Sequence, residues 1–344
     1  MTFMGIACLA LSCKKSNSTG PQDNTTNTTT TTTTTTSFFA KGADVSWLTQ
    51  MEAANYKFYN SSGVQEDCMQ ILKEKGMNTI RLRAWVNPAD GWCNTNDVIA
   101  KAVRAKTLGM KIMIDFHYSD SWADPGKQPK PAVWANLSFT DLVTTMHDYT
   151  VSVLNALIAK GVTPDWVQVG NEVSDGMLWE DGRASTHMAN FAALIKSGYD
   201  AVKSVDNNIK VIVHLNNGYD NSMYRWLFDG LKANNAKWDI IGMSLYPSAA
   251  DWQTKDAQCL SNMNDMVSRY GTPVMIVEVG MDVTQASACK SFLTDLIAKV
   301  KSVNNQQGLG VLYWEPESYN WQNYGLGAFD STGKPTIALD AFVN

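Results

Sequence analysis

The chain lacks several features that would place it in other functional classes. Its 344 residues carry a net charge of −5, so no excess of basic charge indicates a nucleic-acid partner. No apolar run is long enough to span a bilayer. Only four histidines are present, and neither an HExxH motif nor a Cys-x-x-Cys pair occurs. We therefore expect neither a catalytic metal nor a structural zinc.

The four cysteines beyond residue 37 form an even set, which permits disulfides in an exported protein. From their proximity in the chain, we expect Cys68 to pair with Cys93 and Cys259 to pair with Cys289. Four free, buried thiols are the alternative.

The first 37 residues differ in composition from the rest. Residues 1–13 are apolar, rich in small residues and end in LALSC, which resembles the end of a bacterial lipoprotein signal with Cys13 as the acylated residue. Residues 14–37 are largely Thr, Ser and Asn, and cannot bury enough surface to fold. We expect a disordered linker there, and a monomeric catalytic domain over 38–344. The expected location is the outer membrane or cell surface of a Gram-negative bacterium, with the lipid on Cys13 as the only membrane contact.

From residue 38 onwards, short apolar segments alternate with longer amphipathic ones. The expected strands are Gly42–Leu48, Asn78–Trp85, Lys111–His117, Trp166–Glu172, Lys210–Asn216, Ile240–Tyr246, Pro273–Val279 and Gly310–Pro316. The expected helices are Val64–Lys75, Asn96–Leu108, Thr140–Lys160, His187–Val205, Met223–Asn234, Cys259–Tyr270 and Ala288–Val303. Eight strands alternating with helices over about 300 residues predict an α/β fold, a single (β/α)8 TIM barrel. An open doubly wound sheet is the alternative, but it would favour a Gly-rich loop after the first strand.

Polar and aromatic residues gather at the carboxyl ends of these strands, where barrel enzymes build their active sites. A structural explanation exists for each one alone: a core ion pair, a satisfied core histidine, or packing. Their presence at all eight ends is what favours a functional site. The residues are Asp44, Trp47, Arg81, Arg83, Trp85, Asp115, His117, Asn171, Glu172, His214, Asn216, Tyr246, Glu278, Trp314 and Glu315.

Glu172 and Glu278 are the strand-end carboxylates best placed for chemistry. They end the fourth and seventh expected strands, three places apart around an eight-strand ring, so both can project into its mouth. Two carboxyl groups about 5–5.5 Å apart would cleave a glycosidic bond with retained configuration. For Glu172, a structural ion pair or a helix cap is the alternative. Asp44, Asp115 and Glu315 are the competing carboxylates.

Several motifs together resemble glycoside hydrolase family 53, the endo-β-1,4-galactanases. They are GADVSWL, RLRAWVNPADGW, DFHYSDSWADPGKQPKP, QVGNEVSDGMLW, HLNNGYD, GMSLYP, VEVG and YWEP. The run FHYSDSWADPG together with GNEVSDGMLW is specific. An Asn-Glu after the fourth strand with a Glu on the seventh is shared by a wider clan of retaining barrel hydrolases.

The resemblance implies cleavage inside β-1,4-galactan, the side chain of type I arabinogalactan, with galactan and galactooligosaccharides as the ligands. It implies Glu172 as the acid/base and Glu278 as the nucleophile, and it places Asn171 on the 2-hydroxyl of the sugar being cleaved. Arg81 or Arg83, His117 and Tyr246 would support the carboxylates. Stacking on sugar rings would fall to Trp85, Trp122, Trp179 and Trp314, and Asp44, His214 and Asn216 complete the candidate substrate contacts.

Other functions stay open from the sequence. A related barrel could act on a different β-1,4-glycan, such as a mannan or a xylan, or bind glycans without cleaving them. A metal hydrolase would draw its ligands from Asp115, His117 and His214, but these are too few and too scattered to favour one. No cofactor is expected. A structural calcium is not favoured either, because no loop has the pattern of a dedicated site. The resemblance implies the same, since bacterial family members that can hold calcium have a long loop after the seventh strand, whereas the segment Gly280–Cys289 is short here.

Overall fold

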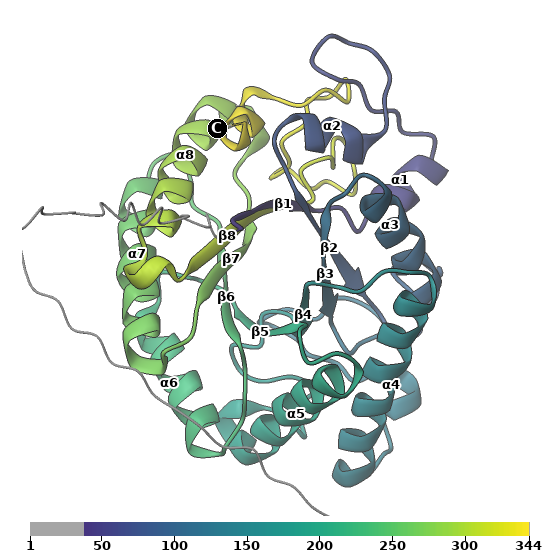
Figure 1. The fold of residues 1–344 in the computed structure, drawn as a ribbon, viewed down its shortest axis with the longest axis vertical. Helices are drawn as coiled ribbons and strands as arrows, with labels where there is room; N and C mark the ends of the chain where they lie inside the picture. Colours follow the sequence, from purple (N-terminus) through teal and green to yellow (C-terminus); the bar gives the residue numbers. More distant parts are fainter. Residues whose placement is uncertain (1–37, 344) are drawn as a thin grey trace, which may run out of the picture. The chain divides into compact units, whose positions relative to one another are not determined.

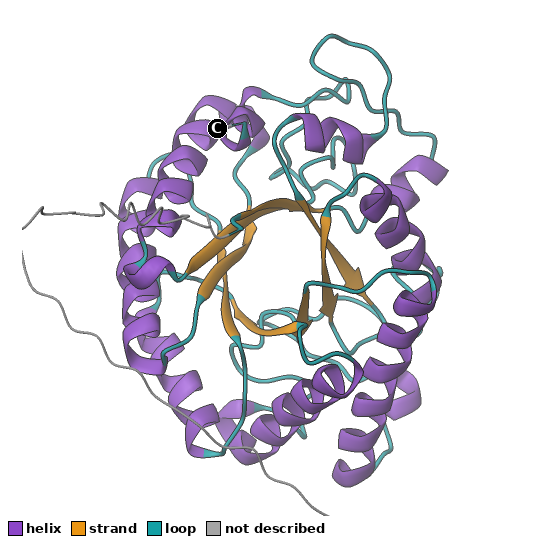
Figure 2. Cartoon of the chain, viewed as in Figure 1, coloured by secondary structure: helices purple, strands orange, loops and turns teal. Residues whose placement is uncertain are grey.

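The structure is a computed structural model that describes residues 38–343. Eight parallel strands pair in chain order and close into a barrel, which is seen end-on as the central ring of Figures 1 and 2. The strands are β1 (Ala40–Asp44), β2 (Thr79–Ala84), β3 (Lys111–Phe116), β4 (Trp166–Val169), β5 (Lys210–Leu215), β6 (Ile240–Leu245), β7 (Val274–Val279) and β8 (Gly308–Trp314). The predicted (β/α)8 barrel is thereby confirmed.

Helices form the outer layer of the barrel (Figure 2). They are α1 (Leu48–Ala53), α2 (Cys68–Glu74), α3 (Thr95–Thr107), α4 (Phe139–Ala159), α5 (Ala184–Val205), α6 (Asn221–Ala233), α7 (Trp252–Tyr270) and α8 (Ala286–Ser302). Short 3-10 helices are η1 (Ala132–Trp134), η2 (Val283–Gln285), η3 (Asn304–Gln306) and η4 (Ile337–Phe342). Seven of the helices correspond to predicted segments. Helix α1 does not, because the sequence prediction assigned its first residue to the preceding strand.

Strands β1 and β4 end several residues earlier than the sequence predicted. β1 ends at Asp44 and β4 ends at Val169, so Trp47 and Glu172 lie in the loops beyond them. Gly170 makes the turn after β4 with a φ of +83°, and a Cβ atom there would approach Val173 to 2.5 Å, so glycine is required. Glu172 itself takes a left-handed φ of +45°, which is uncommon for a residue with a side chain and typical of strained functional loops.

The interior of the barrel changes from apolar to polar along its axis. At the amino end of the strands it is filled by an apolar cluster of Ala40, Met113, Trp166, Ile212, Ile240, Met275, Val277 and Leu312. Two residues further along three of these strands, on the same face, stand the buried polar side chains of Asp115, Gln168 and His214. The apolar layer closes the bottom, so the polar layer faces the mouth. Such a layer needs internal hydrogen bonds because burying unpaired polar groups is costly.

The expected disulfides are wrong: Cys68, Cys93, Cys259 and Cys289 are all free, buried thiols. Cys93 receives a hydrogen bond from Arg83 at 3.4 Å, whereas Cys68 packs in the core on α2. Cys289 lies 3.8 Å from the Tyr313 hydroxyl. Proximity in the chain therefore did not bring the thiols together, because Cys68, Cys259 and Cys289 lie on three different helices, α2, α7 and α8, and Cys93 lies in the loop before α3.

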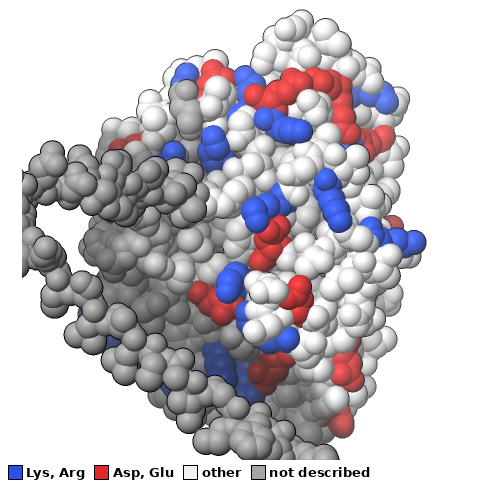
Figure 3. Space-filling model, viewed as in Figure 1, with Lys and Arg blue, Asp and Glu red and all other residues white. Residues whose placement is uncertain are grey.

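On the described face visible in Figure 3, acidic and basic side chains are interspersed, in line with the small net charge. Within residues 38–343, no helix combines the length and apolarity needed to cross a bilayer. The predicted signal segment 1–13 with Cys13 and the predicted linker 14–37 lie outside the described residues.

Candidate active site

A cavity of about 270 Å³ opens at the carboxyl end of the barrel. Both predicted catalytic carboxylates line it, Glu172 from the loop after β4 and Glu278 from β7. The remaining lining residues are His117, Trp122, Ala123, Asp124, Asn171, Tyr246, Trp314, Tyr324 and Leu326. Carboxylates, hydrogen-bonding groups and aromatic faces thus share one cavity.

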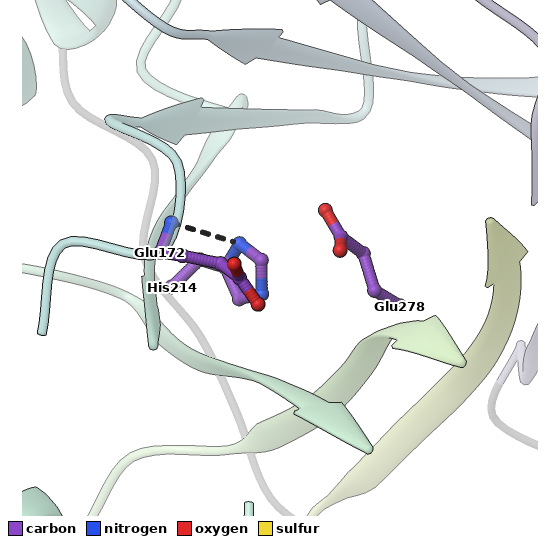
Figure 4. A group of neighbouring side chains, drawn as sticks. All are labelled: Glu172, His214 and Glu278. Atoms are coloured by element: carbon purple, nitrogen blue, oxygen red, sulfur yellow. Dashed lines mark hydrogen bonds between the residues drawn. The ribbon is translucent and has the colours of Figure 1, made fainter. Parts of the chain in front are cut away.

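The carboxyl groups of Glu172 and Glu278 face each other across the cavity (Figure 4). Oxygen atoms of the two groups lie within 4.8 Å of each other. A separation of about 5–5.5 Å between carboxyl groups is typical of retaining glycosidases, and about 6.5–9.5 Å is typical of inverting ones. The geometry therefore fits direct attack by one carboxylate rather than attack by an intervening water.

Arg81, on β2, organises the nucleophile side of the site. Its Nη2 lies 2.8 Å from Glu278 Oε1 and also donates to Asp115 and Asn171, while Nη1 donates to Asp44. The Tyr246 hydroxyl donates to the other oxygen of Glu278 at 3.0 Å. One oxygen of Glu278 therefore forms an ion pair with Arg81 and the other accepts a hydrogen bond from Tyr246, and both contacts stabilise the charged form of this carboxyl.

Glu172 has a different environment. The donor and the acceptor of each hydrogen bond that leads to it can be assigned one after another. Arg81 donates to Gln168 Oε1, so the Gln168 amide nitrogen must face His214 Nδ1, at 2.9 Å. The proton of His214 then lies on Nε2 and is donated to Ser244 Oγ at 2.7 Å. The Ser244 hydroxyl donates in turn to Glu172 Oε1 at 2.6 Å. A proton on Glu172 is thereby left on Oε2.

Strand β6 contacts both carboxyls. Ser244, on the strand, donates to Glu172, and Tyr246, immediately after it, donates to Glu278. The ladder between β6 and β7 shifts register between Met243 and Ser244, so the two donors follow a local irregularity. Bulges of this kind re-aim side chains near active sites.

Burial raises the pKa of the Glu172 carboxyl, although its hydrogen bond from Ser244 acts in the opposite direction. Burial also raises the pKa of Glu278, where Arg81 opposes it and the neighbouring Glu172 adds to it. The pair titrates as a unit, and its first charge is best accommodated on Glu278, which has both Arg81 and the Tyr246 hydroxyl as partners. A protonated Glu172 beside an ionised Glu278 is the resulting state.

His117 and Asn171 are placed to contact a ligand. His117 donates from Nε2 to Asp115 at 3.1 Å and accepts from the backbone of Ala123, and burial lowers its pKa, so the ring is neutral. Asn171 accepts from Arg81 and donates one amide hydrogen to the Ala123 carbonyl at 2.9 Å. Its second amide hydrogen remains for a sugar hydroxyl.

Aromatic rings form one wall of the cavity. Trp122, Trp314 and Tyr324 line it, and the ring centroids of Trp314 and Tyr324 are 4.8 Å apart. Trp47 packs edge-on behind all three, and Trp85 packs edge-on against Trp122 at 5.2 Å. We call Trp122, Trp314 and Tyr324 the aromatic wall. Such rings are suited to the apolar C–H faces of sugars.

Other predicted contact residues do not line the cavity. Arg83 is buried and pairs with Glu315 at 3.2 Å rather than with the catalytic carboxylates. Trp179 stacks on Arg183, 3.7 Å from the guanidinium to its ring centre. Asn216 accepts a hydrogen bond from Ser174 at 2.6 Å. Asp44 and His214 act through Arg81 and Ser244, so they support the cavity rather than form its surface.

The sequence analysis missed Ser244, Gln168 and Tyr324. Ser244 and Gln168 each lie within a strand segment that is otherwise apolar, and a buried polar residue in such a run was the available signal. Tyr324 follows β8 by ten residues, in a loop without periodicity, and no sequence signal pointed to it.

Glu172, His214 and Glu278 are also a potential metal-ligand cluster by distance alone. However, both ring nitrogens of His214 already have hydrogen-bond partners, and Arg81 lies 2.8 Å from Glu278. These contacts favour proton transfer and sugar binding over cation binding.

Solved structures resemble this barrel closely. The GH53 catalytic domain of Ignisphaera aggregans has a TM-score of 0.81 and 30% identity, covering 88% of this chain and 95% of that chain. A structure of fungal β-1,4-galactanases has a TM-score of 0.82 and 29% identity, covering 89% and 99%. Xylanase10C from Cellvibrio japonicus, at 16% identity and a TM-score of 0.66, shares the fold alone.

Sequence comparisons lead to the same family. An uncharacterized protein from Niallia circulans is 36% identical, covering 88% of this chain and 93% of its own length. An endo-β-1,4-galactanase from Bacillus subtilis is 32% identical, covering 84% and 75%. The profile described as glycosyl hydrolase family 53 matches residues 40–342. The chain therefore belongs to glycosyl hydrolase family 53.

Proposed function

We propose that this protein is a retaining endo-β-1,4-galactanase that cleaves internal bonds of galactan and type I arabinogalactan. Membership of family 53 supports the substrate, because relatives of this chain include an endo-β-1,4-galactanase from Bacillus subtilis and an arabinogalactan endo-β-1,4-galactanase from Thermothelomyces thermophilus. The observation that carries the mechanism is the separation of the Glu172 and Glu278 carboxyl oxygens, within 4.8 Å.

In the first step, the ionised Glu278 carboxylate attacks the anomeric carbon and Glu172 donates its proton to the leaving oxygen. A covalent glycosyl-enzyme forms as the glycosidic bond breaks. In the second step, the now ionised Glu172 removes a proton from water, whose oxygen attacks the same carbon and releases Glu278. Two inversions give net retention, and Glu172 regains its proton.

The surrounding residues favour these two protonation states. Arg81 and Tyr246 stabilise the charge on Glu278 before attack. The Ser244 hydroxyl directs the proton of Glu172 to Oε2 by occupying Oε1. Asn171 offers an amide hydrogen to the 2-hydroxyl of the bound sugar, and the aromatic wall offers stacking surfaces.

Hydrolysis assays test this proposal directly. We expect activity on linear β-1,4-galactan and little on mannan or xylan, with intermediate-length galactooligosaccharides appearing early. Proton NMR of the first products should show the β-anomer, as retention requires. Activity on mannan or xylan instead would show that the substrate is a different β-1,4-glycan. Binding without turnover would indicate a glycan-binding barrel.

We further propose that the protein is exported as a monomer and held at the cell surface or outer membrane by a lipid on Cys13. The LALSC pattern before Lys14 and the Thr-rich residues 14–37 support an anchor followed by a tether for the catalytic domain. Incorporation of labelled palmitate that is lost in Cys13→Ser would support the anchor. A wild-type protein that takes up no label would refute it, and sedimentation of the released domain would test the monomer.

A further inference from the structure

Two glutamates on the turn after β8 are fully buried and are not used by the proposed reaction. Glu315 and Glu317 both have no exposed surface. Glu315 accepts the backbone N–H of Trp47 at 3.1 Å and the Arg83 guanidinium at 3.2 Å. It therefore has the partners that an ionised carboxylate needs.

Glu317 has no such partners. Neither of its oxygens accepts a hydrogen bond from an N–H or hydroxyl group of another residue in 38–343. Its carboxyl lies within hydrogen-bonding reach of that of Glu315, and Asp44 is a further acidic neighbour. Two further titratable groups near it, the Cys68 thiol and the Tyr324 phenol, are neutral because burial raises the pKa of each. An ionised carboxylate here would be buried with no donor in the described part of the chain beyond the backbone N–H of Glu317 itself, which is very costly.

A shared proton removes this cost. When Glu317 is protonated, its O–H can donate to the Glu315 carboxylate, a charge-assisted hydrogen bond of the strong kind. Glu315 then carries one negative charge, which the single positive charge of Arg83 balances.

The partners of Glu315 lead directly to the aromatic wall. Arg83 lies under Trp122, with its guanidinium carbon 4.2 Å from the ring centre. Trp47, whose N–H Glu315 accepts, packs against Trp314 at 5.1 Å and Tyr324 at 5.6 Å. The orientation of all three wall residues therefore depends on groups that Glu315 holds.

We propose that Glu317 is a positioning residue that stays protonated, donates to Glu315, and through Arg83 and Trp47 fixes the aromatic wall that receives the sugar rings. The identity of those sugars rests on the proposed function. The protonation state of Glu317 and its contact with Glu315 do not rest on the proposed function.

Two matched substitutions in the full-length protein test the positioning role. Glu317→Gln keeps the shape and an N–H donor, whereas Glu317→Met keeps the length and removes the donor. We expect KM for galactan to change less than about twofold in Glu317→Gln and to rise about tenfold in Glu317→Met, with kcat within about threefold in both. A merely structural role would lower kcat through loss of folded enzyme and leave KM alone. An equal KM in both variants overturns the positioning role.

Infrared difference spectra of ligand-free protein at pH 7 test the protonation state. The spectrum of wild type minus Glu317→Gln should contain the carbonyl band of a protonated carboxylic acid. A carboxylate band in its place overturns the proposal. If the wild type fails to hydrolyse galactan, the proposed function fails, but this measurement is unaffected.

Should Glu317→Met not fold, near-ultraviolet circular dichroism of the tryptophans replaces it. As pH rises, ionisation of Glu317 should disturb the aromatic wall and change the tryptophan signal of the wild type. In Glu317→Gln, which has no carboxyl at this position, the signal should change only at a higher pH. Coincident curves would refute the positioning role.

Discussion

Arg81 and Arg83 stand two residues apart on the same strand, and both are buried, yet they belong to chemically different halves of the mouth. Arg81 is surrounded by acceptors, with Asp44, Asp115 and Glu278 all within 3.0 Å. Arg83 has one carboxylate partner, Glu315, and its other contacts include the Cys93 thiol and the indole rings of Trp85 and Trp122.

The comparison shows how one residue type serves two purposes. Among carboxylates, the guanidinium sets which group is charged, and so it bears on the chemical step. Beneath tryptophans, it supports stacking surfaces through cation–π contact, and so it bears on binding. Changes on the Arg81 side should therefore act on kcat, and changes on the Arg83 side should act on KM.

The largest effect is expected for Glu278→Gln. An amide cannot form the glycosyl-enzyme, so kcat on galactan should fall by about 10⁴-fold or more. Binding of galactooligosaccharides, measured by calorimetry, should stay within a few-fold because the aromatic wall is intact. Glu74→Gln, on the exposed face of α2, is the matched control and should be fully active. Residual turnover near the wild-type level would remove Glu278 as the nucleophile.

Glu172→Gln should slow galactan hydrolysis by about 10³-fold, because general acid assistance is lost. The loss should shrink for a substrate with an activated leaving group, which needs no proton. The wild-type rate should also fall as pH rises through the raised pKa of Glu172, and this alkaline limb should disappear in the variant. An equal loss on both substrates would contradict the acid role.

Paired lysine substitutions test the comparison itself. Arg81→Lys keeps the charge but loses the fork that bridges Glu278 and Gln168, so kcat should drop about 10²-fold. Arg83→Lys should instead raise KM about tenfold, because lysine lacks the flat face under Trp122. Steady-state kinetics on galactan separate the effect on kcat from the effect on KM. Identical effects of the two substitutions would contradict the assignment of Arg81 to the chemical step and of Arg83 to binding.

Ser244→Ala should produce a smaller change on the Glu172 side. Loss of the hydroxyl should reduce kcat by about tenfold. Since that hydrogen bond lowers the pKa of Glu172, its removal should move the alkaline limb to higher pH. A pH–rate profile measures both, and a limb shifted to lower pH would contradict the assigned donor.

Asp256→Asn should affect stability and not activity. Asp256 is buried in α7 and accepts no hydrogen bond from residues 38–343, although Lys299 lies 3.6 Å away. Burial, together with the neighbouring Asp295, raises the pKa of Asp256 to about 7. A raised folded-state pKa means that full stability exists below the ordinary aspartate range and is lost as pH rises to about 7. At pH 8 the variant should therefore melt about 3 °C higher than wild type, with no gain at pH 4. A lower melting temperature at pH 8 would refute this.

The sequence predicted the barrel because strand and helix periods differ clearly, and it predicted that Glu172 and Glu278 would meet because strand order fixes their positions in the ring. It did not separate Arg81 from Arg83. Both face inward with period two, and only the three-dimensional neighbours distinguish them.

Side-chain contacts between strands could not be predicted from the sequence either. The hydrogen-bonded series from Gln168 through His214 to Ser244 joins three strands, and each residue sits in an apolar run that gives no hint of its partner. The cysteine pairing failed for a related reason, because distance along the chain does not set distance in the core.

The contacts of β6 have a consequence for stereochemistry. Its Ser244 and the adjoining Tyr246 each donate to one of the two carboxyls, so a single strand sets how far apart they stand. Inserting one residue between them would turn one hydroxyl to the opposite side of the sheet and free one carboxyl to move. If the gap then widened enough to admit a water molecule, the same barrel would release the opposite anomer.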